Sequence, residues 1–169
     1  MQTKPQTYKD IPFASAELMP FDLVQLKYQG RWARMVVDKE GKFTITDLLG
    51  DLVSSGETDY RSHGIYVGEW MIGTDFAQQP GRAGKFFLFD CWQKNIQNLE
   101  TTDFFQRYQA LSDSLRWLPI WCQPVACYAA KDAKTLWLLP AAQDFPGIVW
   151  RRATESVADT VHYSKRTTS

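Results

Sequence analysis

Short runs in which apolar and polar residues alternate dominate the first half of the chain. They are rich in β-branched and aromatic residues, which is typical of half-buried strands. The runs cover residues 21–28, 32–37, 43–46, 65–71 and 86–91. A turn at Lys39-Glu40-Gly41 joins the second run to the third. The pattern predicts strands that follow one another in a meander.

The period of the pattern changes after residue 100. Phe104, Tyr108, Leu111 and Leu115 recur at intervals of four, three and four residues, which indicates one face of a helix. Residues 101–103 are expected to cap that helix.

A second helix is expected over residues 131–139, where Pro140 ends it. Further strands are expected running toward Tyr128, at residues 147–151 and at residues 160–164.

The order of these elements predicts an α+β fold of two antiparallel β-sheets flanked by helices, with a groove between the sheets. Residues 1–20 are polar and contain three prolines, so we expect an irregular N-terminal segment there. We expect residues 21–169 to form a single domain, because no repeat or flexible linker interrupts them and their length suffices for one full core.

Composition supports a packed globule, with 44% hydrophobic and 14% aromatic residues. Nineteen basic and nineteen acidic residues cancel, so net charge does not indicate a nucleic-acid partner. Basic residues nevertheless cluster over residues 25–42, at Arg151-Arg152 and at Lys165-Arg166.

The three cysteines lie in apolar surroundings and show neither a disulfide framework nor metal-ligand spacing, which favours buried thiols in a reducing compartment. The chain has no signal-peptide pattern, and no apolar run approaches the roughly 20 residues of a membrane span. We therefore expect a cytoplasmic protein without a membrane partner.

Lys27 and Gly30 are the first candidates for chemistry, because they follow an apolar strand in the run Lys27-Tyr28-Gln29-Gly30-Arg31. A lysine amine attacks only after losing its proton, and burial or nearby cations favour the neutral form. The glycine lets the backbone approach a phosphate-bearing ligand. The alternative is a solvated lysine at a strand end.

Later strands end in residues that suit nucleotide binding. A carboxylate such as Glu69 can bond ribose hydroxyls, an aromatic ring such as Phe89 can stack on a purine, and cations can hold phosphates.

Five stretches resemble, in order, the motifs of the adenylyltransferase domain of the covalent nucleotidyltransferases. This superfamily comprises ATP-dependent DNA ligases, RNA ligases and mRNA capping enzymes, and the resemblance is strongest to phage-type DNA ligases. It runs from about residue 21 to residue 166. The stretches are KYQG, GIYVGEWMIGT, KFFLFDCW, FPGIVWRR and HYSKR.

The resemblance implies an ATP-dependent polynucleotide ligase with a ligase-like, ATP-grasp-like fold. Lys27 would attack the α-phosphate of ATP and carry AMP, within a motif that Gly30 also matches. Glu69 would contact the ribose, Phe89 would stack on adenine, and Lys165 would bind the α-phosphate. Mg²⁺ would be required.

The chain departs from these motifs at five positions. Gln29 and Val67 replace aspartates, Leu48 lies near the place of an arginine, and Tyr163 replaces a lysine. Pro146 occupies the place of a metal-binding glutamate and supplies no ligand oxygen.

A surviving enzyme would need another carboxylate for the metal. Asp144 and Glu155 are the candidates, and we predict that Asp144 is the ligand.

The resemblance implies DNA or RNA as partner. Four arginines are predicted to contact its phosphates: Arg31, Arg151, Arg152 and Arg166. The chain stops after the last motif, so we expect no C-terminal OB domain in it and a partner protein in its place. The location would be the host cytoplasm if a phage encodes the chain. The alternative function is a ligase fold without the chemistry, which binds a nucleotide, a nucleic acid or a host protein.

Overall fold

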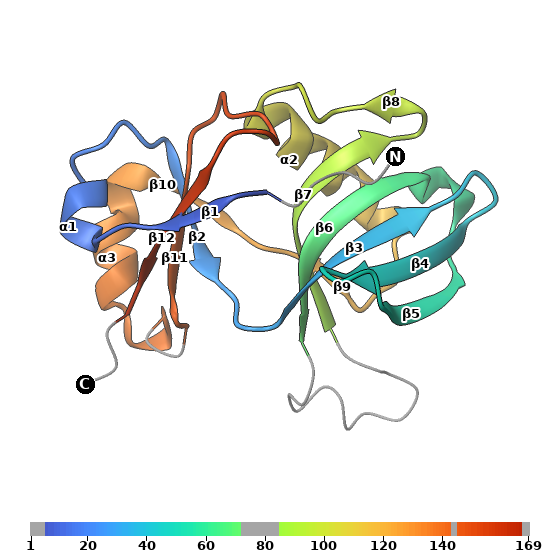
Figure 1. The fold of residues 1–169 in the computed structure, drawn as a ribbon, viewed down its shortest axis with the longest axis horizontal. Coiled ribbons are helices and arrows are strands. Elements are labelled where there is room, and N and C mark those ends of the chain that lie inside the picture. The colour runs from blue at the N-terminus through green and yellow to red at the C-terminus, as the bar shows by residue number, and fades with distance from the viewer. Residues whose placement is uncertain (1–5, 72–84, 143–144, 167–169) are drawn as a thin grey trace. The chain divides into compact units, whose positions relative to one another are not determined.

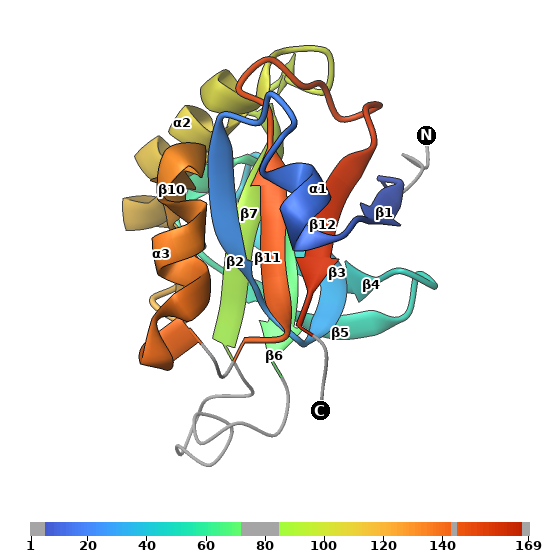
Figure 2. The same ribbon diagram turned by 90° about the vertical axis from the view of Figure 1, so that its left-hand side faces the viewer.

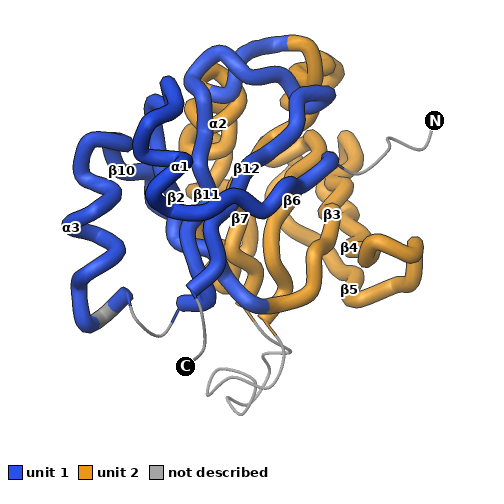
Figure 3. Tube along the Cα trace, turned by 60° about the vertical axis from the view of Figure 1, so that its left-hand side comes forward, with its two compact units in different colours: residues 1–29, 102–104, 126–169 blue, residues 30–101, 105–125 orange. Residues whose placement is uncertain are grey.

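The computed structural model describes residues 6–71, 85–142 and 145–166 (Figure 1). The chain divides into two compact units (Figure 3). Unit 1 contains residues 1–29, 102–104 and 126–169, and unit 2 contains residues 30–101 and 105–125.

Unit 1 is built on a five-stranded sheet with the order β1-β12-β11-β2-β10. The pairing is antiparallel except between β1 and β12, which are parallel. The strands are β1 (Tyr8–Asp10), β2 (Leu23–Lys27), β10 (Cys127–Ala129), β11 (Gly147–Arg151) and β12 (Val161–Lys165).

Helices of unit 1 cover one face of this sheet (Figure 2). They are α1 (Phe13–Ala16), η3 (Ala130–Asp132), α3 (Ala133–Leu138) and η4 (Pro140–Ala142). The core beneath them joins helix residues to Val24, Ile148 and Trp150 of the sheet. Because alternate residues of a strand project to opposite faces, the neighbours of these three residues project away from the core.

Unit 2 is built on a seven-stranded sheet with the order β5-β4-β3-β6-β7-β8, in which β9 also pairs with β7. The strands are β3 (Arg31–Val37), β4 (Lys42–Asp47), β5 (Leu52–Glu57), β6 (Gly64–Met71), β7 (Lys85–Lys94), β8 (Gln97–Asn98) and β9 (Cys122–Pro124). The helical segments that accompany it are η1 (Tyr60–Ser62), α2 (Phe104–Ser114) and η2 (Leu115–Trp117).

Strand β3 shows how the alternating pattern builds the core of unit 2. Ala33, Met35 and Val37 are buried in that core, while Trp32 and Arg34 alternate with them. Leu111 of α2 is buried in the same cluster, as the helical period predicted.

The α+β prediction with two mainly antiparallel sheets is confirmed, and so are the two predicted helices. The expected strand toward Tyr128 is two short strands, β9 and β10. No helix in the described part of the chain is long and apolar enough to span a membrane.

The expectation of an irregular segment over residues 1–20 needs correction, because this segment contains β1 and α1. All three residues of β1 are exposed, so no alternating pattern marks it, and its pairing with β12 creates it. Strand β5 also escaped prediction, because its Ser54-Ser55-Gly56 run lacks the usual strand formers.

Candidate functional site

Lys27 is the last residue of β2, and the sheet register places it beside a second lysine. Lys27 lies opposite Gly147 of β11, and Gly147 lies opposite Lys165 of β12. Residues directly opposite each other in antiparallel strands project from the same face. The two lysines therefore project from the same face of the sheet. No side chain lies between them, because the residue between them is Gly147.

The face of the unit 1 sheet that carries the two lysines is the face that the described helices of unit 1 do not cover. Ile148 and Trp150 of β11 project into the core, so Gly147, Val149 and Arg151 project to the other side. Lys27, Gly147 and Lys165, which we call the lysine row, are thus on the opposite face from the apolar core of unit 1.

Each lysine of the row has its own partner. The Nζ atom of Lys27 lies 5.4 Å from the centroid of the Tyr163 ring, within the range of a cation–π contact. The Nζ atom of Lys165 lies 3.5 Å from Oδ2 of Asp10. That ion pair is exposed on both sides, so it contributes little stability.

Tyr28 anchors the end of β2 directly after Lys27. Its ring meets Phe145 edge-on, with centroids 4.9 Å apart. Burial, with a smaller contribution from Tyr128, raises the pKa of Tyr28 above its ordinary value. The residue next to Lys27 is therefore a packed, neutral phenol.

Gly30 belongs to unit 2, where packing explains it. A Cβ atom at this position would lie 2.7 Å from both Sδ of Met71 and the carbonyl oxygen of Trp70. A larger residue would therefore push β3 away from β6, so Gly30 has a role in the fold independent of any ligand.

Arg31 is tied to Asp47 at the far end of β4. Its Nε atom donates to Oδ2 of Asp47 at 3.0 Å. Burial alone would raise the pKa of Asp47, but the backbone N–H of Asp51, the Arg31 guanidinium and the N–H of Leu49 lower it below the ordinary value. Asp47 is thus a carboxylate that organises the β4–β5 turn, and Arg31 is its counter-charge.

Glu69 and Phe89 lie on neighbouring strands of unit 2, β6 and β7. Glu69 is half-buried and lies opposite both Trp32 and Phe87 in the sheet register. Phe89 is 9% exposed and lies where the register shifts. Alternation places both on the sheet face opposite the core of unit 2.

The prediction that Arg151 belongs to a surface patch is corrected by its burial, since only 1% of the residue is exposed. Its Nη1 atom donates to Oε2 of Glu155 at 3.2 Å, and its Nε atom donates to Oε1 of Gln25 at 3.2 Å. The guanidinium also lies 4.6 Å from the Phe104 ring centroid. Arg151 therefore connects strands within unit 1.

The other two predicted arginines are less enclosed. Arg152 is exposed, with Cζ 5.5 Å from the Phe21 ring centroid. Arg166 is half-buried, and its Nε atom donates to the carbonyl oxygen of Phe145 at 3.1 Å. Burial lowers the pKa of Arg166 from its ordinary value.

The described residues contain no group of three or more side chains that could together hold a metal ion. Glu155 accepts bonds from Arg151 and from the backbone N–H of Arg152 at 2.7 Å, so it is engaged elsewhere. Asp144 lies outside the described residues, and its assignment as metal ligand stays a prediction.

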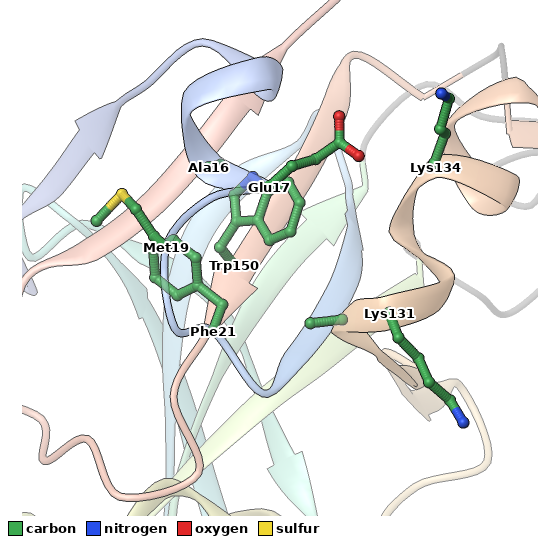
Figure 4. Close-up of a pocket in the computed structure, with 8 residues that line it drawn as sticks. Ala16, Glu17, Met19, Phe21, Lys131, Lys134 and Trp150 are labelled. Carbon is green, nitrogen blue, oxygen red and sulfur yellow. The ribbon is translucent and has the colours of Figure 1, made fainter.

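A hollow of about 240 Å³ lies on the helical side of unit 1 (Figure 4). It is lined by Ala16, Glu17, Met19, Phe21, Ala130, Lys131, Lys134 and Trp150. Trp150 projects to the face opposite Gly147, so this hollow and the lysine row lie on different faces of the sheet.

Sequence reasoning noted Tyr163 only as a departure from a motif and missed its contact with Lys27. The two-residue spacing of Tyr163 and Lys165 in the sequence could have indicated that both lie on the face of Lys27. Tyr163 and Lys165 are two residues apart on one strand, so they share a face. Gly147, which lies opposite both Lys165 and Lys27, carries no side chain on that face.

No protein-family model matches the chain, and no curated protein sequence matches it significantly. Solved structures do match. A Lig E DNA ligase, from a study of DNA binding with a minimal scaffold, aligns with a TM-score of 0.64 and 11% identity over 98% of this chain and 70% of its own.

Two further matches are DNA ligases of a bacterium and a phage. The ligase domain of LigD from M. tuberculosis aligns with a TM-score of 0.67 and 14% identity, over 95% of this chain and 58% of its own. The ATP-dependent DNA ligase of bacteriophage T7, solved in complex with ATP, aligns with a TM-score of 0.64 and 11% identity, over 97% of this chain and 69% of its own. The chain therefore has the fold of the nucleotidyltransferase domain of ATP-dependent DNA ligases, the fold of the superfamily that its motifs resemble.

Proposed function

We propose that this protein binds ATP and acts as a ligase-type nucleotidyltransferase, with Lys27 as the residue that receives AMP. The observation that carries the proposal is the row formed by Lys27, Gly147 and Lys165. Two ammonium groups on one sheet face, with no side chain between them, suit the oxygens of a polyphosphate.

In the proposed step the neutral amine of Lys27 attacks the α-phosphorus of ATP. A P–N bond forms while the bond from the α-phosphorus to the bridging oxygen breaks, and pyrophosphate leaves. The proton lost from nitrogen passes to solvent. Lys165 offsets the negative charge that develops on the α-phosphate oxygens.

The resemblance of the motifs assigns the nucleoside to Glu69 and Phe89. Glu69 accepts hydrogen bonds from ribose hydroxyls, and Phe89 offers a ring for adenine to stack on. The acceptor of AMP is a polynucleotide end, with DNA preferred because the structural matches are DNA ligases.

Magnesium enters with the nucleotide in this proposal. Mg²⁺ is commonly held by substrate phosphates with only one or two carboxylates. The described residues supply no acidic cluster, so we derive no step in which they hold the ion.

A second candidate function is a binding module that keeps the fold and the anion site without transferring AMP. The contact between Tyr163 and Lys27 favours it, because the ring gives the Lys27 ammonium group a cation–π partner within the protein. Pro146, which replaces the expected metal ligand next to Gly147, favours it as well.

The test is the intact mass of the protein after incubation with ATP and Mg²⁺ or Mn²⁺. The wild type is expected to gain one AMP, and Lys27→Ala is expected to gain none. Lys131→Ala is the matched control, because Lys131 is an exposed lysine on η3 away from the row. GTP and NAD are tested in parallel to identify the base and the donor.

Calorimetry with ATP separates the two candidates. Binding that weakens in Lys27→Ala and Lys165→Ala, without any adduct, would support the binding module. A wild type that neither binds ATP nor gains mass would reject both.

A further inference from the structure

Tyr163 contacts Lys27 across an intervening strand. The order of the strands is β12-β11-β2, and Tyr163 lies opposite Val149 whereas Lys27 lies opposite Gly147. The two residues are therefore separated by two strand spacings, about 9–10 Å, and also by two residues along the strands. The Lys27 Nζ atom nevertheless lies 5.4 Å from the Tyr163 ring centroid. The Lys27 side chain must therefore lean over β11.

Gly147 lies where this crossing begins. It is the residue of β11 opposite Lys27, and any side chain there would project from the same face as Lys27. A Cβ atom at Gly147 would also collide with the carbonyl oxygen of Ser164 on β12. The close approach of β11 and β12 thus requires glycine. The Lys27 side chain crosses β11 diagonally, from the level of Gly147 toward that of Val149, the residue opposite Tyr163.

The two like charges of the row have separate partners. Lys27 leans toward β12 and its tyrosine, while Lys165 of β12 reaches Asp10 on β1, the next strand in the same direction. Both side chains lean the same way, so the ammonium groups do not converge above Gly147.

We infer that Tyr163 is a positioning residue that holds the Lys27 side chain across β11, with its ammonium group directed toward β12. The role of this contact in AMP transfer rests on the proposed function. The negative face of the ring attracts the ammonium group of Lys27 and draws its side chain toward β12. The contact therefore fixes where the Lys27 side chain lies before a nucleotide binds.

The test measures how fast an amine-reactive acetylating reagent modifies Lys27 at a fixed pH, without nucleotide, by peptide mass spectrometry. Exposed Lys131 and Lys134 serve as internal references. Tyr163→Leu is expected to speed the modification of Lys27 about two- to fivefold, the change that corresponds to an exposed cation–π contact. Tyr163→Phe keeps the ring and is expected to react at the wild-type rate.

Asp10→Asn is the matched control, since it removes the partner of Lys165 and should leave the Lys27 rate unchanged. If Tyr163→Leu fails to fold, as a thermal melt would show, Tyr163→Val replaces it. A second test needs no variant. In the proton NMR spectrum of the wild type, the Lys27 ε-methylene protons should resonate upfield of those of Lys131, because the Tyr163 ring current shields them.

Any of three results would overturn the inference. The first is an unchanged modification rate of Lys27 in Tyr163→Leu or Tyr163→Val, and the second is a rate in Tyr163→Phe that differs from the wild-type rate. The third is an ε-methylene signal of Lys27 that is not shifted upfield. No nucleotide is present in these measurements. A wild type that gains no AMP would therefore count against the proposed function and leave the role of Tyr163 in holding the ammonium intact.

Discussion

At the residue scale, the three cysteines differ in how deeply they are buried. Cys91 and Cys122 are buried, while Cys127 on β10 is half-buried. Burial, with a smaller effect of the Asp90 charge, raises the pKa of the Cys91 thiol to about 12. Burial also raises the pKa of Cys122 far above its ordinary value. Because the thiolate is the reactive form, the two buried thiols should be inert in the folded protein.

We expect one thiol to react with a disulfide reagent at pH 8 in the native protein, and three in denaturant. Cys127→Ser should abolish the native reaction. Two or more fast native thiols would contradict this expectation.

The same burial predicts a pH dependence of stability. Unfolded thiols ionise near pH 8.5, whereas folded Cys91 stays protonated up to about pH 12. The unfolded state therefore binds fewer protons in this window, and the free energy of unfolding should fall as the pH rises through it.

At the scale of elements, a buried ion pair joins α2 to β7. Arg107 and Asp90 are both fully buried, and Nε of Arg107 lies 2.8 Å from Oδ1 of Asp90. The same oxygen accepts the backbone N–H of Cys91 at 2.8 Å. Removing one partner of such a pair leaves an uncompensated charge in the interior.

Arg107→Met is expected to lower the free energy of unfolding by about 3–5 kcal/mol at pH 7, measured by urea denaturation. The double variant Asp90→Leu/Arg107→Met should recover much of that loss, because it removes both charges. A single variant that costs less than about 1 kcal/mol would show that the pair is not important for stability.

For the whole molecule, charge limits how it can hold a polynucleotide. Net charge is zero, Arg151 is buried and Arg31 is bound to Asp47. Two of the four arginines predicted to contact phosphates are therefore engaged within the protein. Each phosphate contact contributes about −0.9 to the slope of log affinity against log salt.

We expect nicked duplex DNA to bind with a salt slope shallower than about −3, measured by fluorescence anisotropy. Arg152→Ala should make the slope shallower by about 1, while Arg31→Ala should leave it nearly unchanged. A slope of about −6 or steeper would contradict this view of the surface.

Much of the architecture was predictable because its causes are local. Alternation in residues 32–37 and the helical spacing from Phe104 to Leu115 identified β3 and α2, and the buried residues are those that the pattern indicated. The order of the motifs identified the fold that the ligase structures share.

The sites were less predictable than the elements. Lys27 and Lys165 were selected by motif, and the register places them in one row. Arg151 was assigned to the surface, because a basic dipeptide carries no sign that Glu155, Gln25 and Phe104 will enclose one of its members.

By itself, the sequence determined the elements that carry a clear hydrophobic period, such as β3 and α2, because hydrophobic period and turn chemistry act over a few neighbouring residues. Only the tertiary structure decided that the exposed residues 8–10 form a strand, that Gly147 separates two lysines, and that Tyr163 reaches Lys27. Which strands become neighbours, and which residues then lie opposite each other, depends on segments distant along the chain, so the pattern within one segment does not fix it.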